Sequence, residues 1–583
     1  MVVRRRPQRA HRFAESPLLQ LALQGWRSRM VGVLFMLAFM VLILRAFYLQ
    51  IINNDFLQEK GDSRYLRDIE ISASRGKVTD RHGDMLAVST PMRSIWMIPG
   101  DARTMSGEQK RQLAETLDMT PRDIDARLAV EKNFVFVKRQ VAPQVAEQVA
   151  ALKLPGVHQE KEYRRFYPAG EMTAHLVGFT GVDDKGLEGV ELAFQQSLLG
   201  RPGARTVIRD RRGKIVEDVG ATRPPRDGQD IALAIDTKIQ YLAYTHLKAA
   251  VSQHKAKGGG VVVIDPRTGE VLALVNWPTY NPNNRARLSG EQLRNRAVTD
   301  TFEPGSTLKP FTIALGLEKG KYRYDTVIDC SPGRITVGRA VISDVHPHKE
   351  LTVAQVLQKS SNVGTTKMAL SMPPQSMWEM FDALAFGRQP QLGFPGEASG
   401  RLRPWKNWRP IEQATMSYGH GISMSLIQLA RAYTVFARDG DLVPASLLRL
   451  DQPVSRGLPV FSAQTAKEVR AMLELAVGPG GTAPKAAVPG YRVGGKTGTA
   501  HKLDGGVYAN KYIASFVGLA PISSPRLIVA VMIDEPGAGQ YYGGQVAAPV
   551  FSQVMAGALR SLGVPPDASS MQLAAVVTAE EAM

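Results

Sequence analysis

The chain has 583 residues, which is too long for a single hydrophobic core and corresponds to about three or four domains. Its 44% hydrophobic and 22% charged residues are values of a globular protein and exclude a chain that is disordered throughout. The formal net charge of +18 fits anionic lipid headgroups or anionic polymers. Nucleic acid would also fit this charge, but no nucleic-acid recognition motif accompanies it.

The N-terminal region has the pattern of a membrane anchor. Residues 1–29 contain seven arginines against one glutamate, and the predominantly apolar span Met30–Ile52 follows, with Arg45 as its only charged residue. A span of this length can cross a hydrocarbon core of ~30 Å at ~1.5 Å per residue. The alternatives are a cleaved signal peptide and a buried core helix, but no small-x-small cleavage site follows the apolar run. We expect an uncleaved single-pass anchor with its basic tail in the cytoplasm.

The region from residue 53 to about 230 is rich in Arg, Asp and Gly and lacks the arrangement of a catalytic site. Its most distinctive blocks are Ser74–Gly83, Arg165–Gly170 and Gly186–Glu191. We interpret these charged and glycine-rich blocks as packing turns and salt bridges. The segment Ala221–Asp230, with two prolines and one glycine, has the composition of a linker and predicts a domain boundary near residue 230.

The remainder of the chain predicts an α+β domain. Asp236 precedes a helical pattern as its expected N-cap. The runs Val261–Ile264 and Glu270–Val275 flank a turn and predict a β-hairpin. Two further strand-like runs, Tyr512–Leu519 and Leu527–Ile533, come late in the chain. We therefore expect a central antiparallel sheet flanked by helices.

Cysteine usage and the C-terminus add smaller constraints. Cys330 is the only cysteine, which excludes an intramolecular disulfide and suits an exported bacterial protein. We interpret it as a small buried apolar residue. The scattered histidines give no metal-site spacing, so we expect no metal ligation. Residues 563–583 are small and polar and end in acidic residues, which predicts a disordered tail.

Three short motifs after residue 300 form a candidate acylating site. In the first, Ser306–Lys309, positions i and i+3 share a helix face, so the Lys309 amine can act as the general base of the Ser306 hydroxyl. A Ser-x-x-Lys tetrapeptide alone is weak evidence, because it occurs by chance in long proteins. The motifs Ser360–Asn362 and Lys496–Thr499 follow it in the chain, and the order and spacing of all three carry the prediction.

This set resembles the signature shared by penicillin-binding proteins and serine β-lactamases. The resemblance implies a penicilloyl-serine transferase fold, with Ser306 at the base of a cleft beside the strand that bears Lys496. It also implies an oxyanion hole made by the backbone N–H groups of Ser306 and Thr499. A free β-lactamase would lack the anchor and the first outer region, and a bifunctional class A protein would need a longer domain there. The chain is therefore similar to monofunctional class B transpeptidases, whose first outer region is a non-catalytic, dimerisation-like pedestal.

Within this family each motif residue has a chemical role. A desolvated lysine beside another cation can be neutral, so Lys309 is the candidate base, and Lys496 would keep its pKa low. Ser360 would relay the proton toward the leaving amine, and Asn362 would orient Lys309 and the substrate backbone.

The last motif would bind the substrate. Lys496 would supply positive potential for a substrate carboxylate, and the hydroxyls of Thr497 and Thr499 would bind that carboxylate. Gly498 would leave room for a substrate strand along the sheet edge. Pro310, directly after Lys309, would distort a regular helix that begins near Ser306, and we expect this distortion to be tolerated.

The resemblance divides the chain into five parts. These are a cytoplasmic basic tail (1–29), a transmembrane anchor (30–52), a periplasmic pedestal (53–230), a transpeptidase domain (231–562) and a disordered tail (563–583). The blocks most similar to division-specific class B enzymes are Ser417–Gly421, Leu429–Tyr433 and Tyr541–Gly544. His420 stands where we expect an aromatic residue, and we interpret it as a packing or hydrogen-bonding residue of the cleft wall.

The resemblance implies a peptidoglycan D,D-transpeptidase of the bacterial inner membrane, which cross-links stem peptides through a serine acyl-enzyme during septal wall synthesis. It implies no cofactor. The expected partners are stem peptides and their lipid-linked precursor, β-lactam antibiotics, the membrane, an FtsW-type glycosyltransferase and other division proteins. The alternatives are an elongation-type transpeptidase, a D,D-carboxypeptidase and a non-enzymatic β-lactam sensor or scaffold.

Overall fold

The structure is a computed structural model that describes residues 25–56, 60, 66–209, 215–450, 452–454, 456–504 and 507–568. Most of the predicted basic tail (1–24) and of the predicted C-terminal tail (569–583) therefore lies outside the described residues. The chain divides into two compact units, Met1–Ile71 with Pro202–Pro225 and Ser72–Arg201 with Arg226–Met583.

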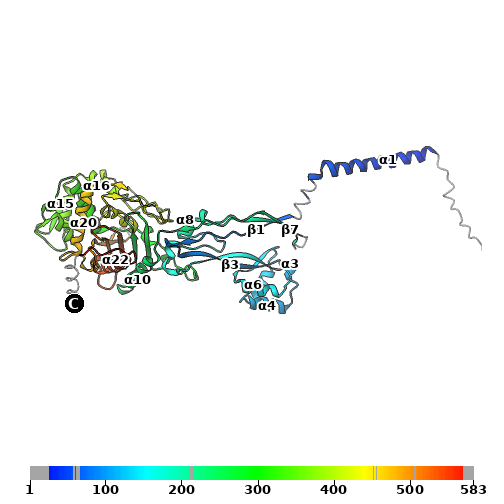
Figure 1. Ribbon diagram of the computed structural model, residues 1–583, viewed down its shortest axis with the longest axis horizontal. Helices are drawn as coiled ribbons and strands as arrows, with labels where there is room; N and C mark the ends of the chain where they lie inside the picture. Colours follow the sequence, from blue (N-terminus) through cyan, green and yellow to red (C-terminus); the bar gives the residue numbers. More distant parts are fainter. Residues whose placement is uncertain are drawn as a thin grey trace, which may run out of the picture. The chain divides into compact units, whose positions relative to one another are not determined.

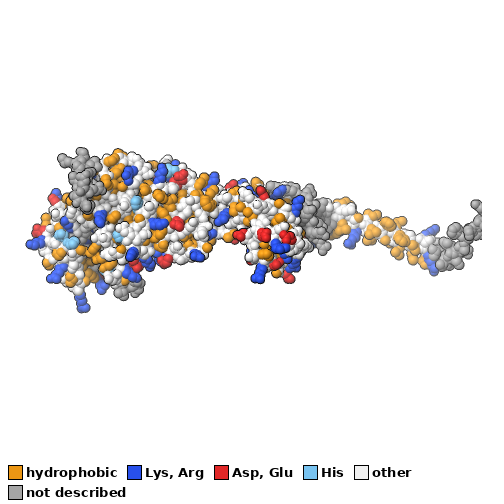
Figure 2. Space-filling model, turned by 90° about the horizontal axis from the view of Figure 1, so that it is seen from below, with side chains coloured by type: hydrophobic (Ala, Val, Ile, Leu, Met, Phe, Trp, Pro, Cys, Tyr) orange, Lys and Arg blue, Asp and Glu red, His pale blue; other side chains and the backbone are white. Residues whose placement is uncertain are grey.

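The first unit contains the predicted anchor. Helix α1 (Gly25–Phe47) continues through a π-helical turn (Tyr48–Ile52). The segment Gly25–Ile52 reaches a mean hydropathy of 2.5, so it is long and apolar enough to cross a membrane once. None of the residues in its most apolar stretch is buried within the protein. Figure 2 shows its side chains as a predominantly hydrophobic surface. The predicted apolar span begins at Met30, whereas helix α1 already includes the five preceding residues from Gly25, which lie outside the apolar pattern.

The same unit contains a three-stranded antiparallel sheet in the order β1-β6-β7. Its strands are β1 (Leu66–Ile71), β6 (Gly203–Arg209) and β7 (Ile215–Arg223). The predicted linker Ala221–Asp230 thus overlaps the end of β7, and only its later part connects two elements.

The second unit begins with a mixed sheet in the order β4-β3-β2-β8, in which β5 pairs with β3. Its strands are β2 (Val78–Thr79), β3 (Met85–Met97), β4 (Val135–Val141), β5 (Val157–Phe166) and β8 (Ile231–Ala232). The helices of this region are α3 (Pro99–Ala102), α4 (Gly107–Thr116), α5 (Pro121–Leu128), α6 (Pro143–Ala151), α7 (Ala174–Val177), α8 (Gly189–Ala193) and α9 (Gln195–Leu198). A small separate core, which includes Ile95, Leu113 and Ile124, joins α4 and α5 to β3.

The three charged and glycine-rich blocks of this region meet at a buried ion triad. The two carboxylate oxygens of Glu191 accept from Arg75 Nε and Arg165 Nε, each at 2.6 Å. The side chain of Glu191 is fully buried, and both arginine side chains are at most 1% exposed. The interpretation as packing and salt-bridge features is confirmed for these residues, and the triad that they form is buried.

The region after residue 230 is built on a five-stranded antiparallel sheet in the order β10-β9-β19-β18-β17. The strands are β9 (Gly258–Ile264), β10 (Val271–Trp277), β17 (Gly494–Asp504), β18 (Val507–Ala520) and β19 (Leu527–Asp534). The predicted hairpin and the two late strands are therefore confirmed. Smaller strands form two-stranded sheets: β11 (Val327–Asp329), β12 (Arg334–Val337), β13 (Ala340–Ser343), β14 (Glu350–Thr352), β15 (Asp441–Leu442) and β16 (Leu458–Pro459).

Helices cover both faces of the five-stranded sheet, because residues along the strands alternate between two hydrophobic clusters. On one face α10 (Thr237–Gln253) and α22 (Ala548–Ser561) pack together, as Figure 1 shows, and Asp236 caps α10 as predicted. The other helices are α11 (Gly290–Leu293), α12 (Arg296–Thr299), α13 (Lys309–Glu318), α14 (Val353–Gln358), α15 (Asn362–Leu370), α16 (Pro374–Ala383), α17 (Pro410–Met416), α18 (Leu426–Ala432), α19 (Thr434–Ala437), α20 (Ala463–Val477) and α21 (Gly543–Val546). Cys330 is fully buried, as expected.

The buried triad predicts a large stability effect at a site far in sequence from the three motifs. Replacing Glu191 by Gln leaves two buried guanidinium groups without their counter-charge, which we expect to lower the free energy of unfolding by about 3–5 kcal/mol. Urea denaturation of both proteins measures it. Glu108→Gln, which breaks an exposed pair with Arg111, is the control and should cost less than about 0.5 kcal/mol. Equal effects of the two variants would contradict the assignment.

Candidate active site

The segment that carries Ser306 is a short 3₁₀ turn, Gly305–Leu308, that leads directly into α13. The backbone N–H of Lys309 donates to the Ser306 carbonyl, and the α-helix begins at Lys309. Pro310 therefore occupies the first turn of the helix, where a missing N–H costs little. The predicted local distortion takes the form of this 3₁₀ turn, in which the Ser306 carbonyl accepts from Lys309 and not from residue 310.

Two buried hydroxyl groups hold this turn in place. The Tyr433 hydroxyl donates to the Thr307 carbonyl at 2.7 Å, and Thr307 Oγ1 donates to the Pro304 carbonyl at 2.8 Å. Tyr433 itself is fully buried in the aromatic packing of Phe311 and Phe436. The turn is thus fixed to the hydrophobic core from behind.

Lys309 lies fully buried below the Ser306 turn. Its ammonium donates to Ser360 Oγ at 3.1 Å and to the Ser360 carbonyl, and among the described residues it makes no hydrogen bond to Ser306. Burial lowers the pKa of Lys309 well below its usual value, the charge of Lys496 lowers it further, and the Asp344 carboxylate opposes both. The structure therefore brings Lys309, Ser360 and Lys496 into one electrostatic site.

The second motif sits at the N-terminus of α15. Ser360 has a positive φ of 59°, and Ser361 caps the helix by accepting from the Gly364 N–H at 2.9 Å. The Asn362 side-chain amide donates to the Ser343 carbonyl at 2.9 Å. The motif is thus anchored to strand β13 through Ser343.

Sequence reasoning missed Asp344, which organises this motif. Its carboxylate accepts from Ser361 Oγ at 2.7 Å and from the backbone N–H groups of Asn362 and Val363. An acidic group at a helix N-terminus satisfies the free N–H groups and the helix dipole. Because a short strand, β14, and a short helix, α14, separate Asp344 from the motif, no local pattern in the sequence could have indicated this contact.

The third motif lies on β17. Lys496 is fully buried, and burial lowers its pKa to about 7. Its ammonium donates to Thr497 Oγ1 at 3.2 Å. Thr497 Oγ1 in turn donates to Thr482 Oγ1 at 3.3 Å, and Thr499 Oγ1 accepts from the Gly543 N–H at 3.0 Å.

Gly498 is required by packing within the protein. A Cβ atom at this position would lie 2.3 Å from Ser515 Oγ and 2.7 Å from the Pro304 carbonyl oxygen. The Ser306 turn therefore lies directly against β17, and the backbones of Gly305 and Thr499 are side by side. This differs from our expectation that Gly498 leaves room for a substrate strand, because the missing side chain would point toward the Ser306 turn.

Comparisons with known proteins match these two regions. A family model of the penicillin-binding protein dimerisation domain matches residues 70–233. The model of the penicillin binding protein transpeptidase domain matches residues 259–556, more than half of the chain. The chain belongs to the penicillin-binding protein transpeptidases. The α+β class, the apolar N-terminal helix and the two-domain class B architecture are thereby confirmed.

Individual relatives span nearly the whole chain. The probable peptidoglycan D,D-transpeptidase PenA of Neisseria gonorrhoeae is 47% identical over 534 residues, 91% of each chain. The peptidoglycan D,D-transpeptidase FtsI of Escherichia coli is 42% identical over 551 residues, 93% of each chain. The solved transpeptidase domain of Burkholderia pseudomallei penicillin-binding protein 3 is 52% identical, with a TM-score of 0.54 over 58% of this chain and 98% of that one. A peptidoglycan synthetase from Bifidobacterium adolescentis, 24% identical with a TM-score of 0.70 over 86% of this chain and 98% of that one, shows the fold alone.

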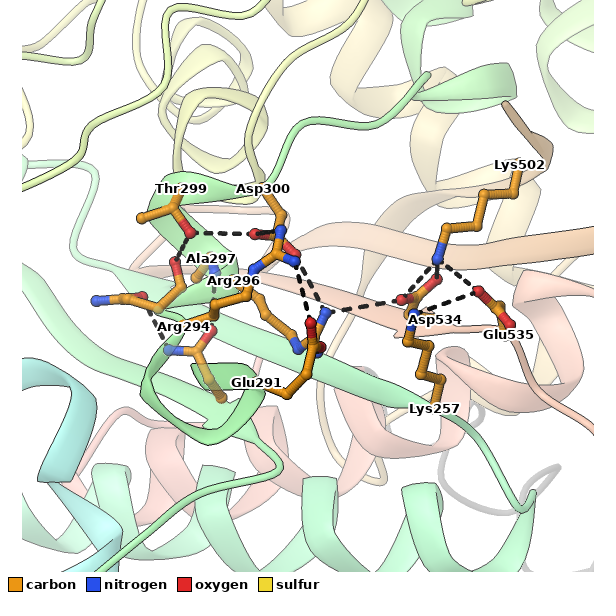
Figure 3. Close-up of polar contacts among 12 residues, drawn as sticks. Lys257, Glu291, Arg294, Arg296, Ala297, Thr299, Asp300, Lys502, Asp534 and Glu535 are labelled. Atoms are coloured by element: carbon orange, nitrogen blue, oxygen red, sulfur yellow. Dashed lines mark hydrogen bonds and ion pairs between the residues drawn. The ribbon is translucent and has the colours of Figure 1, made fainter. Parts of the chain in front are cut away.

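An ion network stabilises the end of the sheet beyond the third motif, at the far end of β17. Lys502 lies in this strand where the pairing with β18 shifts register, since His501 pairs with Tyr512 and Leu503 with Tyr508. Its ammonium donates to both oxygens of Asp534, at 2.7 and 2.9 Å, and to Glu535 at 2.7 Å (Figure 3). The hydrogen bonds outweigh burial and raise the pKa of Lys502 above its usual value.

Arg296 of α12 extends the network toward the segment that precedes Ser306. It pairs with Glu291 at 2.7 Å, with Asp300 at 3.1 Å and with Asp534 at 3.8 Å, as Figure 3 shows. The network therefore connects α12, which precedes Ser306 in the sequence, with β17, which carries the third motif, and with β19, which follows it.

The contact between Gly498 and the Ser306 turn predicts that Gly498→Ala separates the two. We expect the free energy of unfolding to fall by about 1–3 kcal/mol, because the added methyl group meets backbone and a buried hydroxyl. Acylation by a fluorescent penicillin should fall with it. Gly290→Ala, where no atom lies within 4 Å of the new Cβ, is the control and should stay within about 0.5 kcal/mol of the parent. A fully stable Gly498→Ala protein would contradict the packing argument.

Proposed function

We propose that this protein is a peptidoglycan D,D-transpeptidase in which Ser306 is the acylated nucleophile. The observation that carries the proposal is the buried Lys309, whose pKa is lowered, whose amine contacts Ser360 and whose backbone N–H closes the turn that carries Ser306. Membership in the transpeptidase family and the similarity to the peptidoglycan D,D-transpeptidases PenA and FtsI support it. The chemistry is acyl transfer through an ester intermediate.

In the first half-reaction Ser306 Oγ attacks the carbonyl between two D-alanines of a stem peptide. The Oγ–C bond forms, the C–N bond breaks, and the terminal D-alanine leaves. Neutral Lys309 accepts the serine proton, and Ser360, which already contacts the Lys309 amine, passes a proton to the leaving amine. In the second half-reaction an amine of a neighbouring stem peptide attacks the ester carbonyl. The new C–N bond forms, the Oγ–C bond breaks, and a proton of the attacking amine passes to Ser306 Oγ. β-Lactams acylate the same serine.

The remaining motif residues hold the substrate. Lys496 and the hydroxyls of Thr497 and Thr499 line one strand and are suited to the terminal carboxylate of the stem peptide. The backbone N–H groups of Ser306 and Thr499 form the oxyanion hole in this proposal, and the close approach of Gly305 to Thr499 supports their pairing. Asn362 orients the substrate backbone.

The cellular role follows from the relatives and the anchor. The proposed role is septal wall synthesis, as the name FtsI implies for the Escherichia coli relative. The single apolar helix anchors the protein in the inner membrane, with the arginine-rich tail in the cytoplasm and residues after about 53 in the periplasm. The proposed partners are the lipid-linked peptidoglycan precursor, an FtsW-type glycosyltransferase and other division proteins. The proposed boundary between the pedestal and the transpeptidase domain stays at residue 230.

The nucleophile and base are tested by substitution. We expect Ser306→Ala to abolish covalent labelling by a fluorescent penicillin, and Lys309→Ala to slow it by about 10⁴-fold, because base and nucleophile act as a unit. Both variants must retain cooperative unfolding. Labelling of Ser306→Ala at the parent rate would remove Ser306 from the mechanism. A product assay with stem peptides then separates a cross-linked dimer, the expected product, from the shortened peptide of a D,D-carboxypeptidase.

The electrostatic role of Asp344 predicts a pH effect. Lys309 must be neutral to accept the serine proton, so the acylation rate falls as pH drops through its pKa. Asp344 raises that pKa, and Asp344→Asn removes its charge. We therefore expect the acidic limb of the pH–rate profile to move to lower pH. Stopped-flow acylation between about pH 5 and pH 9 measures it, with Asp325→Asn, an exposed aspartate, as the control. A shift in the opposite direction would contradict the base assignment.

A further inference from the structure

Glu303 lies three residues before Ser306, and its carboxylate makes four contacts to two segments that are distant in the chain. Its carboxylate accepts from the Gly421 N–H at 2.8 Å and lies 3.3 Å from His420 Nδ1. The Tyr508 hydroxyl lies 3.1 and 3.2 Å from its two oxygens. The carboxylate thus contacts the turn after α17 and the β17–β18 hairpin at once.

These contacts satisfy both oxygens of a side chain that is only 14% exposed. Burial alone would raise the pKa of Glu303, but the hydrogen bonds from His420, Gly421 and Tyr508 outweigh it, and the pKa lies below its usual value. Burial and the neighbouring carboxylate raise the pKa of Tyr508 to about 12, so its hydroxyl stays protonated and donates. His420 packs between the rings of Tyr418 and Tyr508.

The direction of the hairpin explains how Tyr508 reaches Glu303. Opposite Lys502 the ladder between β17 and β18 shifts register, because His501 pairs with Tyr512 whereas Leu503 pairs with Tyr508, so the extra residues belong to β18. Such an irregularity bends the strand that carries it. Lys502 of β17 is fixed by Asp534 and Glu535 (Figure 3). The hairpin is therefore held by the ion network at Lys502 and by Glu303 at Tyr508.

The segment around Glu303 is also fixed by backbone pairing. Phe302 and Met424 exchange two N–H to carbonyl bonds at 3.0 Å, and the Gly305 N–H donates to the Gly419 carbonyl at 3.1 Å. Glu303 therefore lies between two backbone contacts that join the same pair of segments. The Tyr508 hydroxyl connects strand β18 to this pair of segments.

We propose that Glu303 is a positioning residue of the acylation step, which acts by clamping Tyr508 of the β17–β18 hairpin and the His420–Gly421 turn against the segment that carries Ser306. The clamp fixes the separation between β17, which holds the substrate, and the Ser306 turn. It touches no reacting atom, and its effect is on the geometry in which Ser306 attacks. The inference deepens the proposed function and relies on it only for the identity of the nucleophile.

Tyr508→Phe is the decisive variant, because it removes one hydroxyl from a half-exposed ring and leaves the packing intact. We expect the first-order acylation rate constant for a penicillin to fall about tenfold, the value of one hydrogen bond to a charged group. The dissociation constant of the initial penicillin complex and the melting temperature should change little. Tyr244→Phe is a matched control, since Tyr244 lies on helix α10 and its hydroxyl donates to the carboxylate of Glu171, in the turn Gly170–Met172, at 2.9 Å.

Substitutions of Glu303 complete the test. Glu303→Gln should slow acylation at least as much as Tyr508→Phe, and the double variant should be no slower than Glu303→Gln alone, because both remove the same clamp. Additive losses, or a Tyr508→Phe rate constant equal to that of the parent or of Tyr244→Phe, would overturn the proposal. If the parent protein itself took up no penicillin at Ser306, the proposed function would fail instead, and the two failures are thereby distinguished.

Discussion

The burial of one amine, that of Lys309, is the constraint on which the rest of the site depends. An ammonium group that has lost its water is unstable unless it is paired or gives up its proton. Here Ser360 offers two oxygen atoms that accept hydrogen bonds from the Lys309 amine. The positive charge of Lys496, however, repels a protonated Lys309. The site therefore favours the neutral amine, which is the form that can accept a proton from a serine hydroxyl.

The surrounding fold places the three motifs close together by direct backbone packing. The Ser306 turn lies against β17 at a position where only glycine fits, and α13 runs from this turn into the core with nine of its ten residues buried. The second motif begins α15 and is fixed to β13 by Ser343 and Asp344. Each motif thus belongs to a different element, and rigid elements hold catalytic groups more precisely than free loops do.

The sequence predicted what depends on local pattern and on motif order. Residues along β9, β10, β18 and β19 alternate between two hydrophobic clusters, so the sequence pattern predicted these four segments as strands. The contacts of Glu303 and Asp344 were not, because each acts across segments that are distant in the chain and neither belongs to a motif.

Helix starts and the roles of special residues were also harder to predict. The helix after Ser306 begins later than expected because a 3₁₀ turn precedes it, which makes Pro310 an ordinary first-turn residue. The role of Gly498 depends on which face of β17 meets the Ser306 turn. The spacing of the motifs in the sequence does not show which face this is. The roles assigned to the motif residues remain predictions.

Lys496 has a thermodynamic consequence for ligand binding. With a pKa of about 7, its amine carries a proton in only part of the molecules near neutral pH. A ligand carboxylate placed beside it stabilises the charged form, so binding draws a proton from the solvent. Carboxylate affinity and proton uptake are then coupled reciprocally, and the affinity weakens as the solution becomes more alkaline than that pKa. A site that discriminates a free chain terminus by its carboxylate thereby also responds to the acidity of the compartment in which it works.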